Sequence, residues 1–199
     1  MERSDRLEKR ELILDAALSV FSRKGVFGSR IADIADEAGV AYGLVYHYFK
    51  NKEEILNTIF EDRWARITER LEQAARDGAD ARARLREIAG VFLSSYRSRP
   101  QLVELLLLEF TRMSKYLEPA QLERIGGAFA VVRRVLERGQ AEGEIRSDVA
   151  SELLLLSYLG AIQMIVQSQV LGAFREPDGF AERGAEQVVD VFLQGARVR

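Results

Sequence analysis

Aromatic, hydroxyl-bearing and basic side chains cluster in the short stretch of sequence that follows Gly39. Tyr42 and Tyr46 are four residues apart, so on a helix they share one face, and His47 comes directly after them. Hydroxyl and imidazole groups can hydrogen-bond to phosphates, and aromatic rings can contact the methyl group of thymine. The stretch therefore has the chemistry of a surface that contacts duplex DNA.

The residue types of the chain disfavour a metal site, a cofactor site and enzyme chemistry. His47 is the single histidine and the chain has no cysteine, so the usual zinc-ligand sets cannot form, and we expect no metal and no cofactor. The sequence also lacks a His-paired nucleophile and a phosphate-binding motif, so we expect no catalytic residues. An all-helical enzyme is kept as a third hypothesis, and packing of His47 beside the following helix is the alternative to DNA contact.

Two short helices joined by a tight turn must position the aromatic cluster. The first is expected over about 29–38 with Ser29 as its N-cap, and the second over about 42–49. Gly39 lies at the turn, where the backbone needs φ values that other residues resist. In a helix-turn-helix the first helix braces the second, which enters the major groove. The small core between them would consist of Ile34, Ala35, Ala38, Val40 and Val45.

Longer helices flank this pair. The preceding helix carries one apolar stripe and ends near Gly25, which can take the left-handed C-cap conformation; the stripe is Leu12, Ile13, Ala16, Ala17, Val20 and Phe21. Asn51 is the expected cap of a long following helix, over about 53–76, that connects two domains.

Helical periodicity continues along the rest of the chain, without the period-2 alternation of half-buried strands. We predict an all-α protein of about nine helices: a three-helix helix-turn-helix domain at 1–52 and a helical ligand-binding and dimerisation domain at 53–199. The composition is that of a soluble globular protein, with 47% hydrophobic and 30% charged residues. The absence of cysteine and of an apolar N-terminal signal favours a cytoplasmic location.

The segment from Val149 to Phe174 is apolar on nearly every side, and a membrane span is the competing interpretation. Polar residues interrupt the run, and no uninterrupted stretch of about 18 apolar residues exists. We therefore expect this helix to be buried by protein and expect no membrane association.

The stretch from Gly25 to Leu56 resembles the signature of the TetR/AcrR family of transcriptional regulators. The matching residues are Gly25, Ile31, Ile34, Ala35, Gly39, Val40, Gly43, Tyr46, Phe49, Lys52 and Glu53. Two departures are Arg30, in place of a second hydroxyl residue, and Ala41, in place of a frequent serine. The loss of that serine removes a potential N-cap of the second helix, at a cost of about 1 kcal/mol.

The resemblance implies a DNA-binding role for nine residues: Ser29, Arg30, Tyr42, Gly43, Leu44, Tyr46, His47, Tyr48 and Lys52. Five of them fall at positions that would face DNA, from Tyr42 to Leu44 with Tyr46 and His47. Tyr46, Tyr48 and Lys52 would hold phosphates, with Arg30 as an added contact, and Ser29 would cap the bracing helix beside the DNA backbone.

The family likeness further implies a homodimer, formed through the last two helices, that represses transcription from a pseudo-palindromic double-stranded operator. A small hydrophobic effector, with acyl-CoA or a fatty acid as one candidate, would release it. Polar residues among apolar ones are candidate ligand contacts, although they could equally line a wet cavity or an interface: Glu109, Arg112, Tyr158, Gln163 and Gln167. The alternative is a DNA-binding protein that acts constitutively or through a protein partner, without a small-molecule effector.

Overall fold

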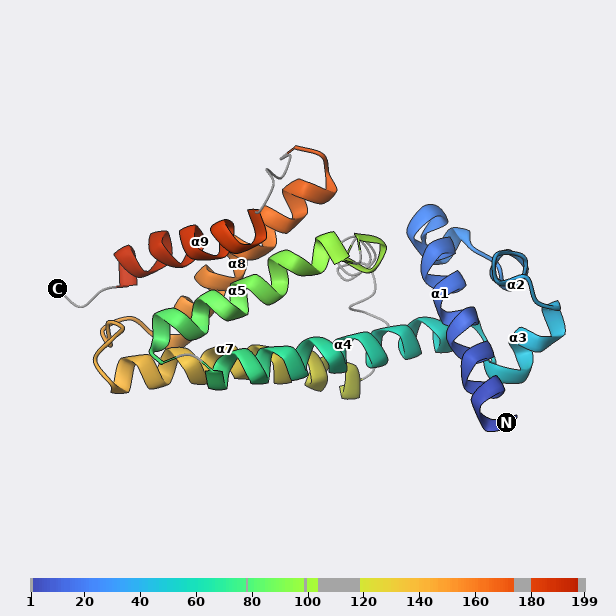
Figure 1. Ribbon diagram of the computed structural model, residues 1–199, viewed down its shortest axis with the longest axis horizontal. Coiled ribbons are helices and arrows are strands. Elements are labelled where there is room, and N and C mark those ends of the chain that lie inside the picture. Colours follow the sequence, from blue (N-terminus) through green and yellow to red (C-terminus); the bar gives the residue numbers. More distant parts are fainter. Residues whose placement is uncertain (1, 78, 99, 104–118, 174–179, 197–199) are drawn as a thin grey trace. The chain divides into compact units, whose positions relative to one another are not determined.

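A computed structural model of the protein describes residues 2–77, 79–98, 100–103, 119–173 and 180–196, and this part of the chain is helical without strands (Figure 1). The all-α prediction is confirmed for these residues. The described helices are α1 (Glu2–Gly28), α2 (Ile31–Ala38), α3 (Tyr42–Tyr48), α4 (Lys52–Asp77), α5 (Ala81–Ser98), α7 (Pro119–Ala141), α8 (Ser151–Val170) and α9 (Phe180–Ala196).

The chain forms two compact units, and α4 belongs to both of them. The first unit holds the described residues up to Arg63 together with residues 101–103, and the second holds the remaining described residues. The first unit continues past the boundary expected after Lys52 because Ile55, Leu56 and Ile59 of α4 are buried in its core.

The core of the first unit is built on α1, which packs against α2. Of the predicted apolar stripe, Leu12 is exposed and the other five residues are buried. At Gly25 the backbone has φ 69° and ψ 159° and interrupts the helix, after which residues 26–28 form one more turn. The positive φ predicted for Gly25 is confirmed, but its ψ lies outside the left-handed helical region.

The start of α4 is capped by side chains, as the sequence predicts. The side-chain oxygen of Asn51 accepts a hydrogen bond from the backbone N–H of Glu54 at 2.8 Å. The carboxylate of Glu54 in turn accepts from the backbone N–H of Lys50 at 2.6 Å. These two bonds satisfy donors that an uncapped helix would leave without partners, and they fix the point at which the chain leaves α3.

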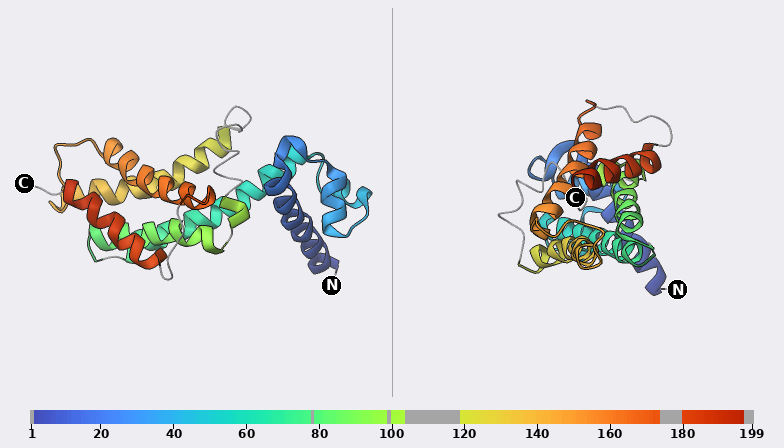
Figure 2. Two further views of the ribbon diagram at one scale, coloured as in Figure 1. Left: turned by 90° about the horizontal axis from the view of Figure 1, so that it is seen from above. Right: turned by 90° about the vertical axis from the view of Figure 1, so that its left-hand side faces the viewer.

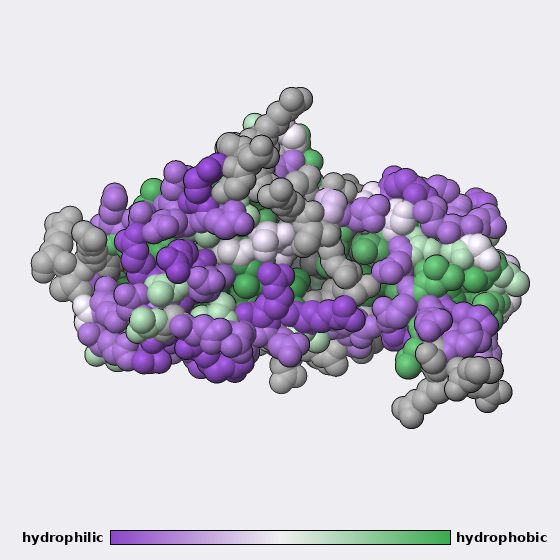
Figure 3. All heavy atoms as spheres, in the orientation of Figure 1, coloured by the Kyte–Doolittle hydropathy of each residue, from purple (hydrophilic) through white to green (hydrophobic). Residues whose placement is uncertain are grey.

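The second unit is a helical bundle in which α5 packs against α7, α8 and α9 (Figures 1 and 2). Its core contains Leu85, Ile88 and Leu93 of α5 and Leu136 of α7, all of them fully buried. Hydrophilic side chains cover most of the face of this unit that Figure 3 shows. The apolar faces of its amphipathic helices are thus turned toward one another.

Helix α8 is long and apolar enough to cross a membrane by length and composition, and 33% of its most apolar stretch is buried. It nevertheless packs against α5, α7 and α9 in the second unit. The core helix of a bundle meets the same length and composition criteria as a membrane span, so this property alone does not indicate a membrane.

Candidate nucleic-acid interface

The turn between α2 and α3 is centred on Gly39, which has φ 64° and ψ 33°. This left-handed conformation is strained for residues with a Cβ atom, which explains the glycine at this position. The N–H of Gly39 donates to the carbonyl of Asp36 at 3.2 Å, and the N–H of Val40 donates to that of Ala35 at 3.0 Å. The turn predicted at Gly39 is confirmed, and it sets the angle at which α3 leaves α2.

Small apolar residues hold α2 and α3 together. Ile34, Ala35, Ala38 and Val45 are buried, and the partly buried Val40 packs against them. Because alanine side chains are short, they allow the backbones of neighbouring helices to approach closely. The predicted core between the two helices is confirmed, and it leaves the opposite face of α3 in solvent.

That outer face of α3 carries a pair of tyrosines. Tyr42 is 53% exposed and Tyr46 is 48% exposed. Their hydroxyl oxygens are 3.2 Å apart, at hydrogen-bond distance, and their rings meet edge to face with centroids 5.2 Å apart. The hydrogen bond to Tyr42 raises the pKa of Tyr46. The two side chains form one exposed aromatic surface with two hydroxyl groups.

The other predicted contacts on α3 differ in exposure. Gly43 and His47 are exposed, whereas Leu44 and Tyr48 are half-buried. Tyr48 packs against the core of the first unit, and its ring meets the imidazole of His47 edge to face at 5.3 Å between centroids. Ala41 is the N-cap and makes no side-chain cap hydrogen bond, as expected from the absence of a hydroxyl group there.

Ser29 does not cap α2, so that prediction is wrong. The N-cap is Arg30, whose backbone N–H donates to the carboxylate of Asp33 at 2.8 Å. The Ser29 side chain is buried and its hydroxyl donates to the carbonyl of Val26 at 2.7 Å. Ser29 therefore closes the connection between α1 and α2 from inside, while the exposed Arg30 is placed on the surface.

Lys52 is likewise directed inward. Its ammonium group donates to the carbonyl oxygens of Val26 at 2.8 Å, Ser29 at 3.3 Å and Phe27 at 3.4 Å. These three acceptors match the three donors of an ammonium group. In this structure Lys52 therefore joins the first residue of α4 to the connection between α1 and α2, and its phosphate contact stays a prediction.

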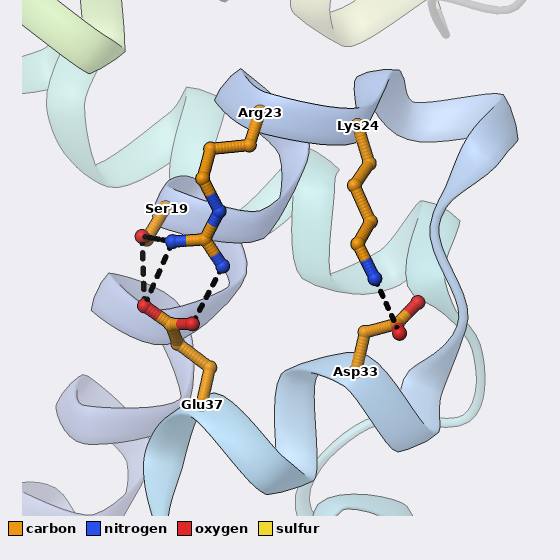
Figure 4. Close-up of polar contacts among 5 residues, drawn as sticks. All are labelled: Ser19, Arg23, Lys24, Asp33 and Glu37. Atoms are coloured by element: carbon orange, nitrogen blue, oxygen red, sulfur yellow. Dashed lines mark hydrogen bonds and ion pairs between the residues drawn. The ribbon is translucent and has the colours of Figure 1, made fainter.

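Two ion pairs that the sequence analysis did not identify join α1 to α2 (Figure 4). The Arg23 guanidinium binds both carboxylate oxygens of Glu37, at 2.6 Å and 3.1 Å, and the Ser19 hydroxyl donates to the same carboxylate at 2.9 Å. Lys24 donates to Asp33 at 2.7 Å. We call these five residues the α1–α2 clamp; it fixes the bracing helix on which α3 rests.

The α1–α2 clamp gives a prediction for the dependence of stability on pH. The hydrogen bonds from Arg23 and then Ser19 lower the pKa of Glu37 from 4.5 to about 2. Because the folded-state pKa is depressed, the stabilisation is fully present above pH 4.5 and is lost as the pH falls toward 2. We expect Glu37→Gln to lower the melting temperature at pH 7, and we expect the difference from wild type to shrink as the pH falls through that window.

Asp36→Asn is the matched control for this prediction, because Asp36 is exposed on the same helix and the substitution removes the same charge. Thermal unfolding followed by circular dichroism at several pH values measures both variants against the wild type. A constant difference between Glu37→Gln and wild type from pH 7 to pH 2 contradicts the assignment.

The predicted ligand-contact residues do not form one pocket among the described residues. Glu109 and Arg112 lie outside them. Tyr158 is fully buried, its hydroxyl donates to the carbonyl of Leu85, its ring lies 5.3 Å from that of Phe192, and burial raises its pKa. Gln163 is exposed and Gln167 is half-buried. Tyr158 thus packs inside the helical bundle in this structure, and its ligand contact stays a prediction.

The second unit also contains polar features that the sequence did not reveal. A groove of about 530 Å³ between α4 and α5 is lined by both charges, including Arg70, Asp77, Arg86 and Glu87. The side chain of Arg84 is buried; it donates to the carbonyl of Ala79 at 3.3 Å and lies 4.0 Å from Glu142. Arginine is rarely buried, so no sequence pattern distinguishes Arg84 from the surface arginines around it.

Family models match both parts of the chain. The description "Bacterial regulatory proteins, tetR family" applies to residues 13–59, and "Tetracyclin repressor-like, C-terminal domain" applies to residues 82–190. The first match contains the helix-turn-helix with its exposed tyrosines, and the second spans most of the helical bundle.

Named relatives cover most of the chain. It is 30% identical to the fatty acid metabolism regulator protein of Bacillus subtilis, over 80% of this chain and 82% of that protein. It is 32% identical to the transcriptional repressor NicS of Pseudomonas putida, over 70% of this chain and 67% of that protein. The crystal structure of FadR from Bacillus subtilis in complex with stearoyl-CoA matches with a TM-score of 0.82 and 26% identity, over 94% of this chain and 99% of that one.

The chain belongs to the TetR family of bacterial regulatory proteins. The crystal structure of the fatty acid degradation regulator FadR from Bacillus halodurans supports the fold, with a TM-score of 0.83 over 96% of this chain and 97% of that one, at 22% identity. The protein is accordingly a DNA-binding transcriptional repressor, and its relatives are regulators of transcription.

Among the described residues, no group of three His, Cys, Asp or Glu side chains is arranged to hold a metal ion.

Proposed function

We propose that the protein acts as a homodimer that places two copies of α3 in successive major grooves of a pseudo-palindromic operator, and that a fatty-acyl ligand releases it. The observation that carries this proposal is the exposed pair Tyr42 and Tyr46 on a helix whose other face is packed on α2. A dimer with two-fold symmetry reads half-sites about one turn of DNA apart.

The DNA contacts that we propose follow from exposure. Tyr42, Gly43, Tyr46 and His47 are exposed and would meet base edges or phosphates, with Leu44 at the margin of the contact. Arg30 is exposed on the surface where α2 begins and would bind a phosphate. The remaining three predicted residues would support the DNA-contacting surface from inside the unit. Tyr48 packs against the core, and Ser29 and Lys52 hold the backbone that precedes α2.

The dimer contact that we propose lies on α8 and α9. Leu153, Leu156 and Met164 recur along α8 at spacings that share a face, and they are 58%, 65% and 62% exposed. Val191 of α9 is also largely exposed. Large exposed apolar stripes are uncommon on monomers, and an isologous contact between two copies would bury them. This accounts for the apolar character of α8 without a membrane, and we place the repressor in the cytoplasm.

The effector class that we propose is a long-chain fatty-acyl compound such as an acyl-CoA. It is supported by the relative that binds stearoyl-CoA and by the fatty acid metabolism regulator at 30% identity. Gln163, Gln167, Glu109 and Arg112 stay predicted contacts. The ligand must bind the conformation that cannot bind DNA more tightly than the operator-binding one. A preference of about 1–3 kcal/mol weakens operator affinity by about 5- to 150-fold.

The test begins with selection of bound sequences from random duplex DNA by the full-length protein. The affinity for the selected duplex is then measured by fluorescence anisotropy with stearoyl-CoA, with free coenzyme A as the control. We expect stearoyl-CoA to weaken binding at least about fivefold and coenzyme A to have little effect. Tight operator binding that no acyl compound weakens would instead establish the alternative, a repressor without a small-molecule effector.

A further inference from the structure

Arg10 of α1 contacts two other helical segments of the first unit at once. Its guanidinium carbon lies 5.7 Å from the centre of the Phe49 ring, within the range of a cation–π contact. Its Nη1 atom is 3.4 Å from a carboxylate oxygen of Asp62 on α4. The same Nη1 atom is 3.5 Å from a carboxylate oxygen of Glu11, its neighbour on α1. The Nη1 atom carries two hydrogens, so in this structure it donates to a carboxylate on α4 and to one on α1 at nearly equal distances.

The two segments that Arg10 joins have distinct positions in the unit. Phe49 directly follows α3; it is buried, and its N–H closes the helix by donating to the carbonyl of Val45 at 2.9 Å. Asp62 lies one residue before Arg63, where the first unit ends along α4. Arg10 thus links the end of the DNA-contacting helix to the last part of α4 that packs with it.

Besides the buried apolar residues of α4, two cations attach this helix to the rest of the first unit, and they differ in character. Lys52 is half-buried, and its three donors reach three backbone carbonyls. The Arg10–Asp62 contact is longer and is formed by side chains that are 32% and 40% exposed. Exposed ion pairs contribute little and exchange partners readily. The Arg10 contact is therefore the part of this attachment that can open without unfolding.

We propose that Arg10 is a positioning residue that couples α4 to α3, by holding Asp62 of α4 beside Phe49 at the end of α3 in the operator-binding conformation. The inference rests on the proposed function, because it names a contact through which a ligand would act on the DNA-contacting helix. Neither Arg10 nor its partners need touch DNA or ligand.

Asp62→Asn and Glu11→Gln form a matched pair for the test, because each removes one negative charge beside the same Arg10 atom. Asp62→Asn breaks the link to α4 and should reduce the stearoyl-CoA-dependent loss of operator affinity about two- to fivefold. Glu11→Gln removes a charged acceptor that lies on α1 itself and should leave that loss unchanged. Equal shifts in the two variants, or no shift in Asp62→Asn, overturn the proposal.

A second measurement needs no effector. Trp64 is the single tryptophan and lies two residues beyond Asp62 on α4, so its fluorescence reports on this part of the helix. We expect operator DNA to change Trp64 emission in wild type and Glu11→Gln, and to change it by less than half as much in Asp62→Asn and Arg10→Ala. An equal response in all four proteins, or none in the wild type, contradicts the Arg10 link. A further outcome is that stearoyl-CoA fails to release the wild-type protein from the operator while Trp64 emission still responds to DNA as expected. That result would disprove the proposed effector and would still support the Arg10 link.

Discussion

Replacing Tyr42 and Tyr46 together by alanine is expected to weaken operator binding at least about 100-fold while leaving the melting temperature and the dimer unchanged. Each side chain is about half exposed and lies on the face of α3 turned away from the core. Loss of one base-edge contact costs about 1–3 kcal/mol, and a dimer loses every contact twice. Because neither tyrosine belongs to the buried core of the first unit, folding should be little affected.

Single substitutions at Tyr42 and Tyr46 separate the contribution of the hydroxyl groups from that of the aromatic rings. Their hydroxyl groups are hydrogen-bonded to each other, so the two single effects should not add up to that of the double variant. Tyr42→Phe and Tyr46→Phe keep the rings and test the hydroxyl groups alone. Phe129→Ala, an exposed aromatic residue on α7, is the control and should bind the operator as wild type does. A double variant with wild-type affinity would exclude the outer face of α3 from the interface.

Leu156→Asp is expected to convert the dimer into a monomer and thereby to weaken operator binding by about 100- to 10,000-fold, since two linked DNA-binding units gain that much from acting together. Leu156 is 65% exposed in the single chain, so the substitution costs little within the subunit. In a dimer packed through α8, two buried carboxylates would face an apolar surface. Sedimentation or light scattering gives the mass, and circular dichroism checks the fold.

Gly160→Leu tests the same surface in a different way. A Cβ atom at Gly160 meets no other atom within 4 Å, so a larger side chain fits the isolated subunit. It would nevertheless block close approach of a second α8, because small residues permit that approach. Phe129→Asp places the same charge on an exposed apolar position of α7 and should leave the mass unchanged. A Leu156→Asp protein that is still dimeric at micromolar concentration would move the interface away from α8.

Local chemistry along the chain was sufficient to predict the helix-turn-helix. Gly39 adopts the left-handed conformation expected for it, and the apolar residues at helical spacing in α2 are those buried in the structure. The cap at Asn51 is also confirmed, since the backbone N–H that donates to its side chain belongs to Glu54, only three residues away. Each of these features depends on residues within one turn or one helix, where sequence spacing fixes geometry.

The side-chain contacts that the sequence did not predict depend on how the helices pack, and most of them join residues that are distant in the sequence. Lys52 binds carbonyl oxygens more than twenty residues earlier, and Arg23 pairs with a carboxylate fourteen residues later. Ser29 could have accepted from the N–H groups of α2, but it donates backward to the end of α1 instead. The residue type establishes that a hydrogen bond is possible, whereas the packing of α1 against α2 decides which partner is within reach.

The central claim, that paired copies of α3 read the major groove, is tested most directly by dimethyl sulfate protection on the selected operator. Guanine N7, the atom methylated by this reagent, lies in the major groove. We predict protected guanines in two symmetric half-sites centred about 10 base pairs apart, with protection lost in the Tyr42→Ala/Tyr46→Ala variant. Protection confined to one half-site, or unchanged in that variant, would contradict the account.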